Sequence, residues 1–300
     1  MSTQLQLLQR IGPVSQKVIS DLGLLAEFAG TWVGKGFNLI ARPNKQGGSV
    51  FFLMLNGTSE TLEFTPIGGA VPNRGSVQDD IFIHGLSYLQ RVSDLDTYAP
   101  LHIEPGFWLH VPPTRDPLDP KDSYVRLSTI PHGDSLVAQS VFATEVKGPP
   151  VLAPVDALPF RIVPGTPIPG LNQVPNPDPI TTLGYIDPYL NPKMPPSVTS
   201  PQPAAAIVHN PVLLLQDAIA HQTIERTVVI QVSSANHGGI LNIPFVVKNA
   251  NTVQMDSIFW IETVRTEQGT FQQLQYVQRV MLDFDGIHWP HVSVATLVKQ

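Results

Sequence analysis

The sequence has no cysteine, little charge and no long apolar run. Without thiols, its 300 residues cannot form disulfides, zinc–thiolate sites, iron–sulfur clusters or a cysteine nucleophile. Only 14% of the residues are charged, the net charge is −6, and lysine and arginine never form a run, which argues against nucleic acid or an anionic membrane surface as partners. No apolar stretch approaches the ~18 residues of a membrane span, and residues 1–10 lack an export signal. We therefore expect a soluble, cytoplasmic protein.

Helical patterns are also scarce, whereas the thirty prolines are about twice the usual share. One amphipathic helix is predicted over residues 13–29, where apolar residues recur on one stripe and Gly30 ends the pattern. Residues 1–29 then form an N-terminal segment with a capping helix. A second, shorter helix is predicted over 211–221, because Pro211 suits the first position of a helix.

Most of the remaining chain alternates apolar and polar residues at the two-residue period of a β-strand. Many short strands without intervening helices indicate an antiparallel sandwich or barrel, and about ten strands can close around a ligand-sized lumen with no free edge. We predict an all-β fold, a closed antiparallel β-barrel of about ten strands that forms a single domain over residues 1–300. The predicted strands are 31–40, 49–64, 80–93, 101–111, 123–129, 135–144, 223–233, 240–247, 252–265, 271–283 and 290–298.

The composition changes abruptly within residues 148–222. Sixteen of the thirty prolines lie between Pro149 and Pro203, and proline removes the amide donor and fixes φ, so the pattern predicts neither helix nor central strand there. The segment also keeps many apolar residues, which favours an ordered insertion packed on the barrel over a disordered linker. A lid, an arm for a homodimer and a brace along the barrel wall are all open roles for it.

The last strand carries the best candidate for a ligand. His291, Ser293 and Ala295 alternate with Val292 and Val294, so one face is bulky and the other offers an imidazole beside two small side chains. If the second face looks into a cavity, it provides a nitrogen ligand for a metal and space for a flat group. The alternative is a surface histidine on a C-terminal edge strand.

Two further patterns have competing interpretations. His102 and Glu104 lie two apart on one strand and point to the same side, so with His110 or His132 they could form a non-haem metal site. We prefer the alternative in which Glu104 pairs with a cation and the histidines bond carbonyl groups. Gly34 and Gly36, which share a face of the first strand, mark either a barrel corner or close approach of a ligand.

Three stretches together resemble one family. The segment 30–36, GTWVGKG, matches a G-x-W-x-G-x-G signature in full. The segment 101–108, LHIEPGFW, is similar to an H-x-E-x-G-aromatic strand, and 131–133, PHG, stands where a P-T-G turn is usual. The tail 290–297, PHVSVATL, resembles a closing P-H-L-x-A-x-L strand. Over residues 20–145 and 224–300 the sequence thus resembles the nitrobindin-like haem-binding β-barrels.

The resemblance implies a b-type haem whose iron is bound by His291. It also implies that the glycine-rich first strand lies near the cofactor, and that His132, which replaces the usual threonine, could supply a distal hydrogen bond or a sixth ligand. The implied activities are binding of small diatomic molecules such as nitric oxide and isomerisation of peroxynitrite to nitrate. The cofactor-binding residues expected on this basis are His291, Thr31, Trp32, Gly34, Gly36 and His132.

The insertion 148–222 has no counterpart in that family, and it could reshape or close the lumen. Two functions therefore stand side by side. The first is a haem protein that binds diatomic ligands or processes reactive nitrogen or oxygen species. The second is a lipocalin-like carrier without haem, which holds a fatty-acid-like or other apolar small molecule.

Overall fold

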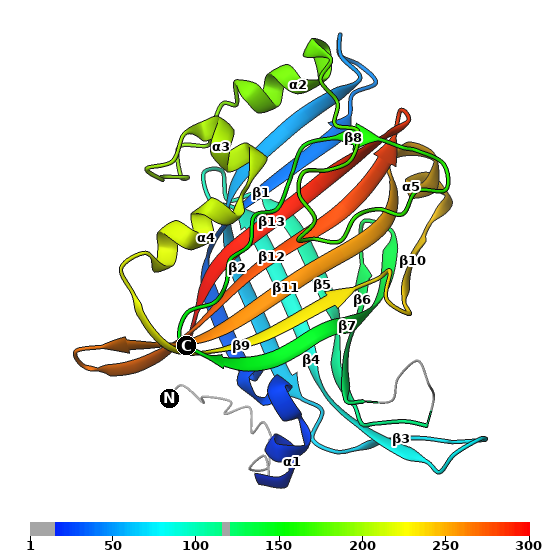
Figure 1. Cartoon of the computed structure of the whole chain (residues 1–300), viewed down its shortest axis with the longest axis vertical. Helices are drawn as coiled ribbons and strands as arrows, with labels where there is room; N and C mark the ends of the chain where they lie inside the picture. The colour runs from blue at the N-terminus through cyan, green and yellow to red at the C-terminus, as the bar shows by residue number, and fades with distance from the viewer. Residues whose placement is uncertain (1–15, 116–120) are drawn as a thin grey trace, which may run out of the picture.

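The computed structural model describes residues 16–115 and 121–300, and its main feature is a closed antiparallel barrel (Figure 1). The barrel closes because β1 and β13 pair directly, from Trp32 opposite Lys299 to Leu39 opposite Val292. This confirms the predicted fold class. The ten barrel strands are β1 (Gly30–Pro43), β2 (Phe51–Pro66), β4 (Ile81–Asp94), β5 (Pro100–Val111), β6 (Ser123–Ile130), β7 (Asp134–Lys147), β9 (Thr223–Ser233), β11 (Asn251–Thr266), β12 (Gly269–Phe284) and β13 (Ile287–Lys299).

Three short strands extend the sheet. β3 (Val71–Asn73) pairs with β4, β8 (Phe160–Arg161) with β13, and β10 (Gly239–Asn242) with β7. The predicted strand over 240–247 is wrong in its second half, because the chain turns at Ile243 into helix α5 (Pro244–Asn249). The apolar run 244–247, PFVV, is typical of a strand, but a proline also suits the first position of a helix.

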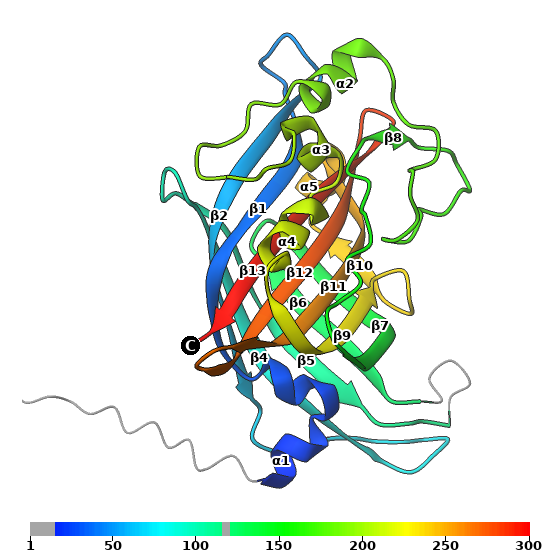
Figure 2. The same ribbon diagram turned by 60° about the vertical axis from the view of Figure 1, so that its left-hand side comes forward.

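The N-terminal segment forms two short helices, α1 (Gln16–Asp21) and the 3₁₀ helix η1 (Gly23–Phe28). The single helix predicted over 13–29 is broken because Gly23 adopts φ 57°, and residues 13–15 lie outside the described part of the chain. Phe28 is fully buried, and its carbonyl accepts a 2.7 Å hydrogen bond from Trp32 Nε1. In both ribbon views these helices lie at one end of the barrel (Figures 1 and 2).

The proline-rich segment runs along the outside of the barrel and contains helices α2 (Leu183–Leu190), α3 (Ala204–His209) and α4 (Val212–Ile219) (Figure 2). The prediction of no helix between 149 and 203 is wrong for α2, which includes Pro188. This helix tolerates the missing amide because Ile186 N donates to Thr182 O before the proline and Asn191 N donates to Asp187 O after it. The helix predicted over 211–221 is present as α4.

Alternation along the strands divides the apolar residues into two layers. The inner layer fills the end of the barrel beside η1 and includes Trp32, Trp108 and Phe259. The outer layer lies between the wall and the insertion, where Trp260 and Val292 of the barrel belong to one buried cluster with insertion residues. The insertion residues of that cluster include Leu152, Val155, Ile180, Tyr189, Ile207 and Leu215. Among the described residues, no helix is both long and apolar enough to cross a membrane.

Candidate functional site

A cavity of about 470 Å³ lies inside the barrel, on the side of the inner apolar layer away from η1. Its mouth is bordered by the turn between β6 and β7 and by α5, because His132, Ile240 and Val246 are among the lining residues. The volume falls within the ~300–1,000 Å³ of typical small-molecule sites. Much of the wall is aliphatic, but three clusters of polar side chains interrupt it. They centre on His291, on His102 with His132, and on Glu60.

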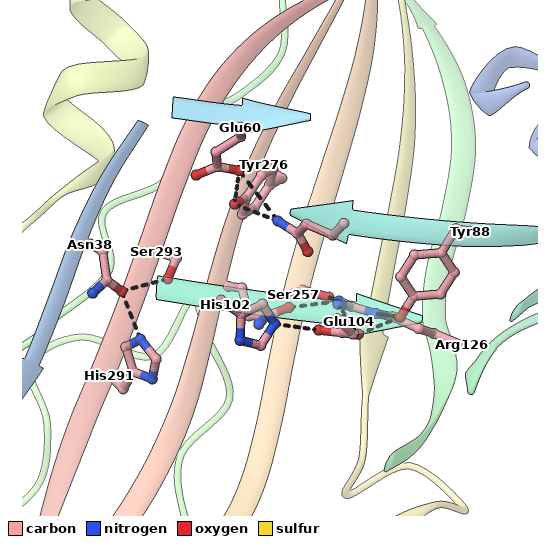
Figure 3. Close-up of polar contacts among 12 residues, drawn as sticks. Asn38, Glu60, Tyr88, His102, Glu104, Arg126, Ser257, Tyr276, His291 and Ser293 are labelled. Atoms are coloured by element: carbon pink, nitrogen blue, oxygen red, sulfur yellow. Dashed lines mark hydrogen bonds and ion pairs between the residues drawn. The ribbon is translucent and has the colours of Figure 1, made fainter. Parts of the chain in front are cut away.

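His291 faces this cavity from β13, as the alternation of the strand predicts. Ser293 lines the cavity beside it, whereas Val292 and Val294 belong to the outer apolar cluster. The alternative of a surface histidine on an edge strand is excluded, because β13 pairs with β1 on one side and β12 on the other. His291 Nε2 lies 2.7 Å from Asn38 Oδ1, which also accepts a 3.0 Å hydrogen bond from Ser293 Oγ (Figure 3).

This environment fixes the protonation of His291. Burial lowers the pKa of His291 to about 3, and the positive charges that His102 and His132 can carry act in the same direction. The imidazole is therefore neutral at physiological pH. Because Asn38 Oδ1 is an acceptor, Nε2 holds the proton, and Nδ1 keeps a free lone pair with no hydrogen bond to the described residues. A neutral imidazole nitrogen at a cavity is a metal or hydrogen-bond acceptor site.

His102 and His132 form a second group near the mouth. Their ring centroids are 5.4 Å apart, and both residues line the same cavity as His291. Burial lowers the pKa of His132, and His102 lowers it further. His102 Nε2 lies 3.2 Å from Glu104 Oε2, which confirms that the two side chains point to one side of β5. Three imidazoles therefore border one lumen.

Glu104 is fully buried, but it is held by a cation. Arg126 Nη2 on β6 donates to Glu104 Oε1 at 2.7 Å, and the Tyr88 hydroxyl donates to the same oxygen. Burial alone would raise the pKa of Glu104, but Arg126, His102 and Tyr88 outweigh it and hold that pKa well below its usual range. Arg126 also donates to Gln278 Oε1 at 2.6 Å. The preferred interpretation of Glu104 as an ion-pair partner is confirmed.

This arrangement leaves too few free side chains to act as ligands of a non-haem metal. His110, a proposed third ligand, lies near the other end, where its Nδ1 is 2.7 Å from Asp21 O. His132 does approach His102, but the carboxylate of Glu104 is taken up by Arg126. Within residues 16–115 and 121–300, no group of three histidine or carboxylate side chains is arranged to hold a metal ion.

The third group lies deeper in the lumen and centres on Glu60 of β2. Its Oε2 accepts a 2.6 Å hydrogen bond from the Tyr276 hydroxyl (Figure 3). The same oxygen accepts a 3.3 Å bond from Gln90 Nε2, and Oε1 accepts a 2.7 Å bond from Thr58 Oγ1. Burial raises the pKa of Glu60, and the three hydrogen bonds only partly oppose this.

None of the first-strand candidates is among the residues that line the cavity, although Gly36 adjoins Glu60, whose Oε1 would lie 2.8 Å from a Cβ there. Trp32 is fully buried in the inner apolar layer, and Thr31 lies next to it beside η1. A Cβ on Gly34 would come within 2.2 Å of Thr296 O, and one on Gly36 within 2.4 Å of Val294 O. These two glycines therefore permit the tight β1–β13 seam, which favours the barrel-corner interpretation.

Several lumen residues were missed by sequence reasoning. Asn38 could have been found, because it continues the inward series of Gly34 and Gly36 along β1. Glu60 and Arg126 gave no local signal, since a single charged residue inside an alternating strand reads as an outward side chain. Their partners are distant in sequence, and pairing between them depends on closure of the barrel.

The comparisons with known proteins do not place the chain in a family. No protein-family model matches the chain, and no curated protein matches it. Among solved structures, the crystal structure of Rv2717c from M. tuberculosis is similar at 12% identity and a TM-score of 0.43, over 93% of this chain and 97% of that chain. At these values, the likeness says nothing about the ligand. The strand pairing alone establishes a barrel that is compatible with ligand binding.

Proposed function

We propose that the lumen binds a small molecule and that this molecule is a b-type haem, with His291 as the iron ligand. The observation that supports the proposal is the neutral imidazole of His291, whose free Nδ1 belongs to a residue lining a cavity of about 470 Å³. The protein supplies three things that such a cofactor needs: an unprotonated nitrogen donor, aliphatic walls, and Arg42 at the rim as a partner for a carboxylate.

Asn38 has the supporting role in this proposal. Its Oδ1 accepts from both His291 Nε2 and Ser293 Oγ, so it fixes the ring orientation and the tautomer. Such hydrogen bonds to the second ring nitrogen make an imidazole a better ligand. His102 and His132 line the same lumen and would hydrogen-bond a polar ligand there. A bound haem would supply the iron centre for diatomic ligands or peroxynitrite, as in the nitrobindin-like family that the sequence motifs resemble.

Haem titration of the full chain tests the proposal. The wild type is expected to give a Soret band that saturates at one haem per chain, and His291→Ala to lose at least tenfold in haem affinity. His221→Ala is the matched control, because His221 is exposed outside the barrel and should leave the titration unchanged. A wild type that takes up no haem, or a His291→Ala variant with an unaltered spectrum and affinity, would contradict the proposal.

The aliphatic wall also favours a second function, a haem-free carrier of an apolar molecule. Val92, Leu136, Met255 and Val280 line the cavity between its polar groups, and such walls are typical of sites for apolar ligands. In this case an apolar molecule should co-purify with the protein, and His291→Ala should barely change its binding. Mass spectrometry of organic extracts from the purified wild type and variant distinguishes the two functions.

A further inference from the structure

Glu60 differs from Glu104, another acidic residue that lines the lumen, in having no cation beside it among the described residues. Glu60 is 2% exposed, and its three hydrogen-bond donors, Thr58, Gln90 and Tyr276, are all neutral. Glu104, by contrast, is paired with Arg126 at 2.7 Å. Within the described part of the chain, no lysine, arginine or histidine lies within ion-pair distance of Glu60.

A buried carboxylate without a cation is costly, because desolvation penalises the charged form and neutral donors compensate only in part. Glu60 nevertheless lines the cavity together with all three of its donors. The missing positive charge can therefore be supplied from the lumen. Thr58, Gln90 and Tyr276 occupy three acceptor positions of the carboxylate, and a carboxylate offers about four.

We propose that the deep end of the lumen is a binding site for the primary ammonium group of an apolar amine, with Glu60 as its counter-ion. This goes beyond the proposed haem site, because it concerns a different group of residues. Gln90 Nε2 donates to the Tyr276 hydroxyl, and both side chains donate to Glu60 Oε2. These hydrogen bonds hold the carboxylate in position. The aliphatic wall formed by Val92, Met255 and Val280 accommodates the body of the amine.

The register of the strands separates the two sites. Tyr276 pairs with Ala295, and Val280 pairs with His291, so Tyr276 lies four residues from the level of His291. Four residues of strand span roughly 13 Å. An ammonium at Glu60 and a ligand on His291 therefore occupy different levels of the lumen.

The other ionisable groups near Glu60 do not replace this cation. His102 on β5 favours the ionised form of Glu60, but at a distance beyond an ion pair. Arg126 on β6 is committed to Glu104, Tyr88 and Gln278. Tyr276 on β12 is neutral, because burial and the adjacent Glu60 raise the pKa of its hydroxyl well above the usual value.

Calorimetric titration of the haem-free full chain at pH 7 with hexylammonium chloride and with 1-hexanol tests the proposal. An apolar cavity without a counter-ion prefers the alcohol, because an ammonium group is far more costly to desolvate. With Glu60 as counter-ion, the wild type is expected to bind the ammonium at least tenfold more tightly. Glu60→Gln, which keeps the shape of the side chain, is expected to reverse this order.

Glu262→Gln is the matched control. Glu262 is another buried acid with no cation beside it in the described part of the chain. It lies on the outer face of the barrel wall, so its substitution should leave the ratio of ammonium to alcohol affinity unchanged. A wild type that binds the alcohol as tightly as the ammonium, or that binds neither, overturns the proposal without any variant. Retention of the preference in folded Glu60→Gln also overturns it. Haem uptake is read from the Soret band, so the two proposals fail independently.

Discussion

Glu262 of β11 is a buried acid at the contact between the barrel and the segment that follows α4. Gln273 Nε2 donates to its Oε2 at 2.6 Å, and Gln273 is in turn paired with Gln222 at 3.0 and 3.1 Å. Oε1 of Glu262 has no hydrogen-bond partner among the described residues. Burial raises the pKa of Glu262 to about 7, and the bond from Gln273 only partly opposes this. The folded protein therefore holds a proton that the unfolded chain releases near its ordinary pKa of 4.5.

This difference predicts a pH-dependent stability. Between pH 4.5 and 7, unfolding releases the proton of Glu262, so the free energy of unfolding falls as pH rises, by up to about 3 kcal/mol. Glu262→Gln removes this loss. The free energy of unfolding of the variant, relative to that of the wild type, should therefore rise progressively from pH 5 to pH 8. Urea unfolding at several pH values measures the gap. Glu267→Gln, at an exposed position, is the control. A difference in unfolding free energy between the wild type and Glu262→Gln that does not change with pH would contradict the raised pKa of Glu262.

At the scale of one element, β1 is shaped by the close approach of its neighbours. It pairs along its length with β2, and over Trp32 to Leu39 also with β13. At Gly34 a Cβ would meet the backbone oxygen of Thr296 at 2.2 Å and the Cα of Leu297 at 2.8 Å. Neither backbone atom can move away without breaking the seam. Glycine at this position therefore allows the close approach of β1 and β13.

Gly34→Ala should destabilise the protein by about 1–3 kcal/mol, the usual cost of overpacking a tight site. Gly239→Ala is the matched control, because Gly239 also lies in a strand and has no atom within 4 Å of its Cβ position. Thermal unfolding of both variants measures the difference. Equal melting temperatures for Gly34→Ala and the wild type would show that the seam can open without cost.

At the scale of the whole molecule, the insertion covers a wall that would otherwise be apolar and exposed. Its two ends are adjacent, because Gly148 N donates to Glu225 O at 2.8 Å and Thr227 Oγ1 donates to Gly148 O. A short linker could therefore replace residues 149–222 without breaking a barrel strand. The replacement would expose Trp289, Val292 and Val294, which pack against the insertion.

The protein with this replacement should fail to fold to a stable monomer. Each large apolar side chain returned to water costs about 1.5–3 kcal/mol, and several are uncovered against a typical total stability of 5–15 kcal/mol. Dye binding to exposed apolar surface and size-exclusion chromatography measure the outcome. A linker that replaces the exposed residues 45–48 is the control. A soluble deletion protein with cooperative unfolding would show that the insertion is not a brace.

The sequence was most informative where the pattern was local. Period-two alternation located all ten barrel strands, and the small residues after His291 predicted that its side chain faces the lumen. It was least informative where partners come from distant strands. Tyr276 and Glu60 are 216 residues apart, and neither shows in its own strand that the other lies beside it.

The pairing of β1 with β13 joins the first barrel strand to the last. During synthesis, β1 emerges early, and its outer edge stays unpaired until the residues of β13 have left the ribosome. Unpaired strand edges are templates for pairing with other chains, and contacts between distant segments form slowly. His291 lies on that last strand, so the nascent chain gains its candidate site and loses its open edges in the same step.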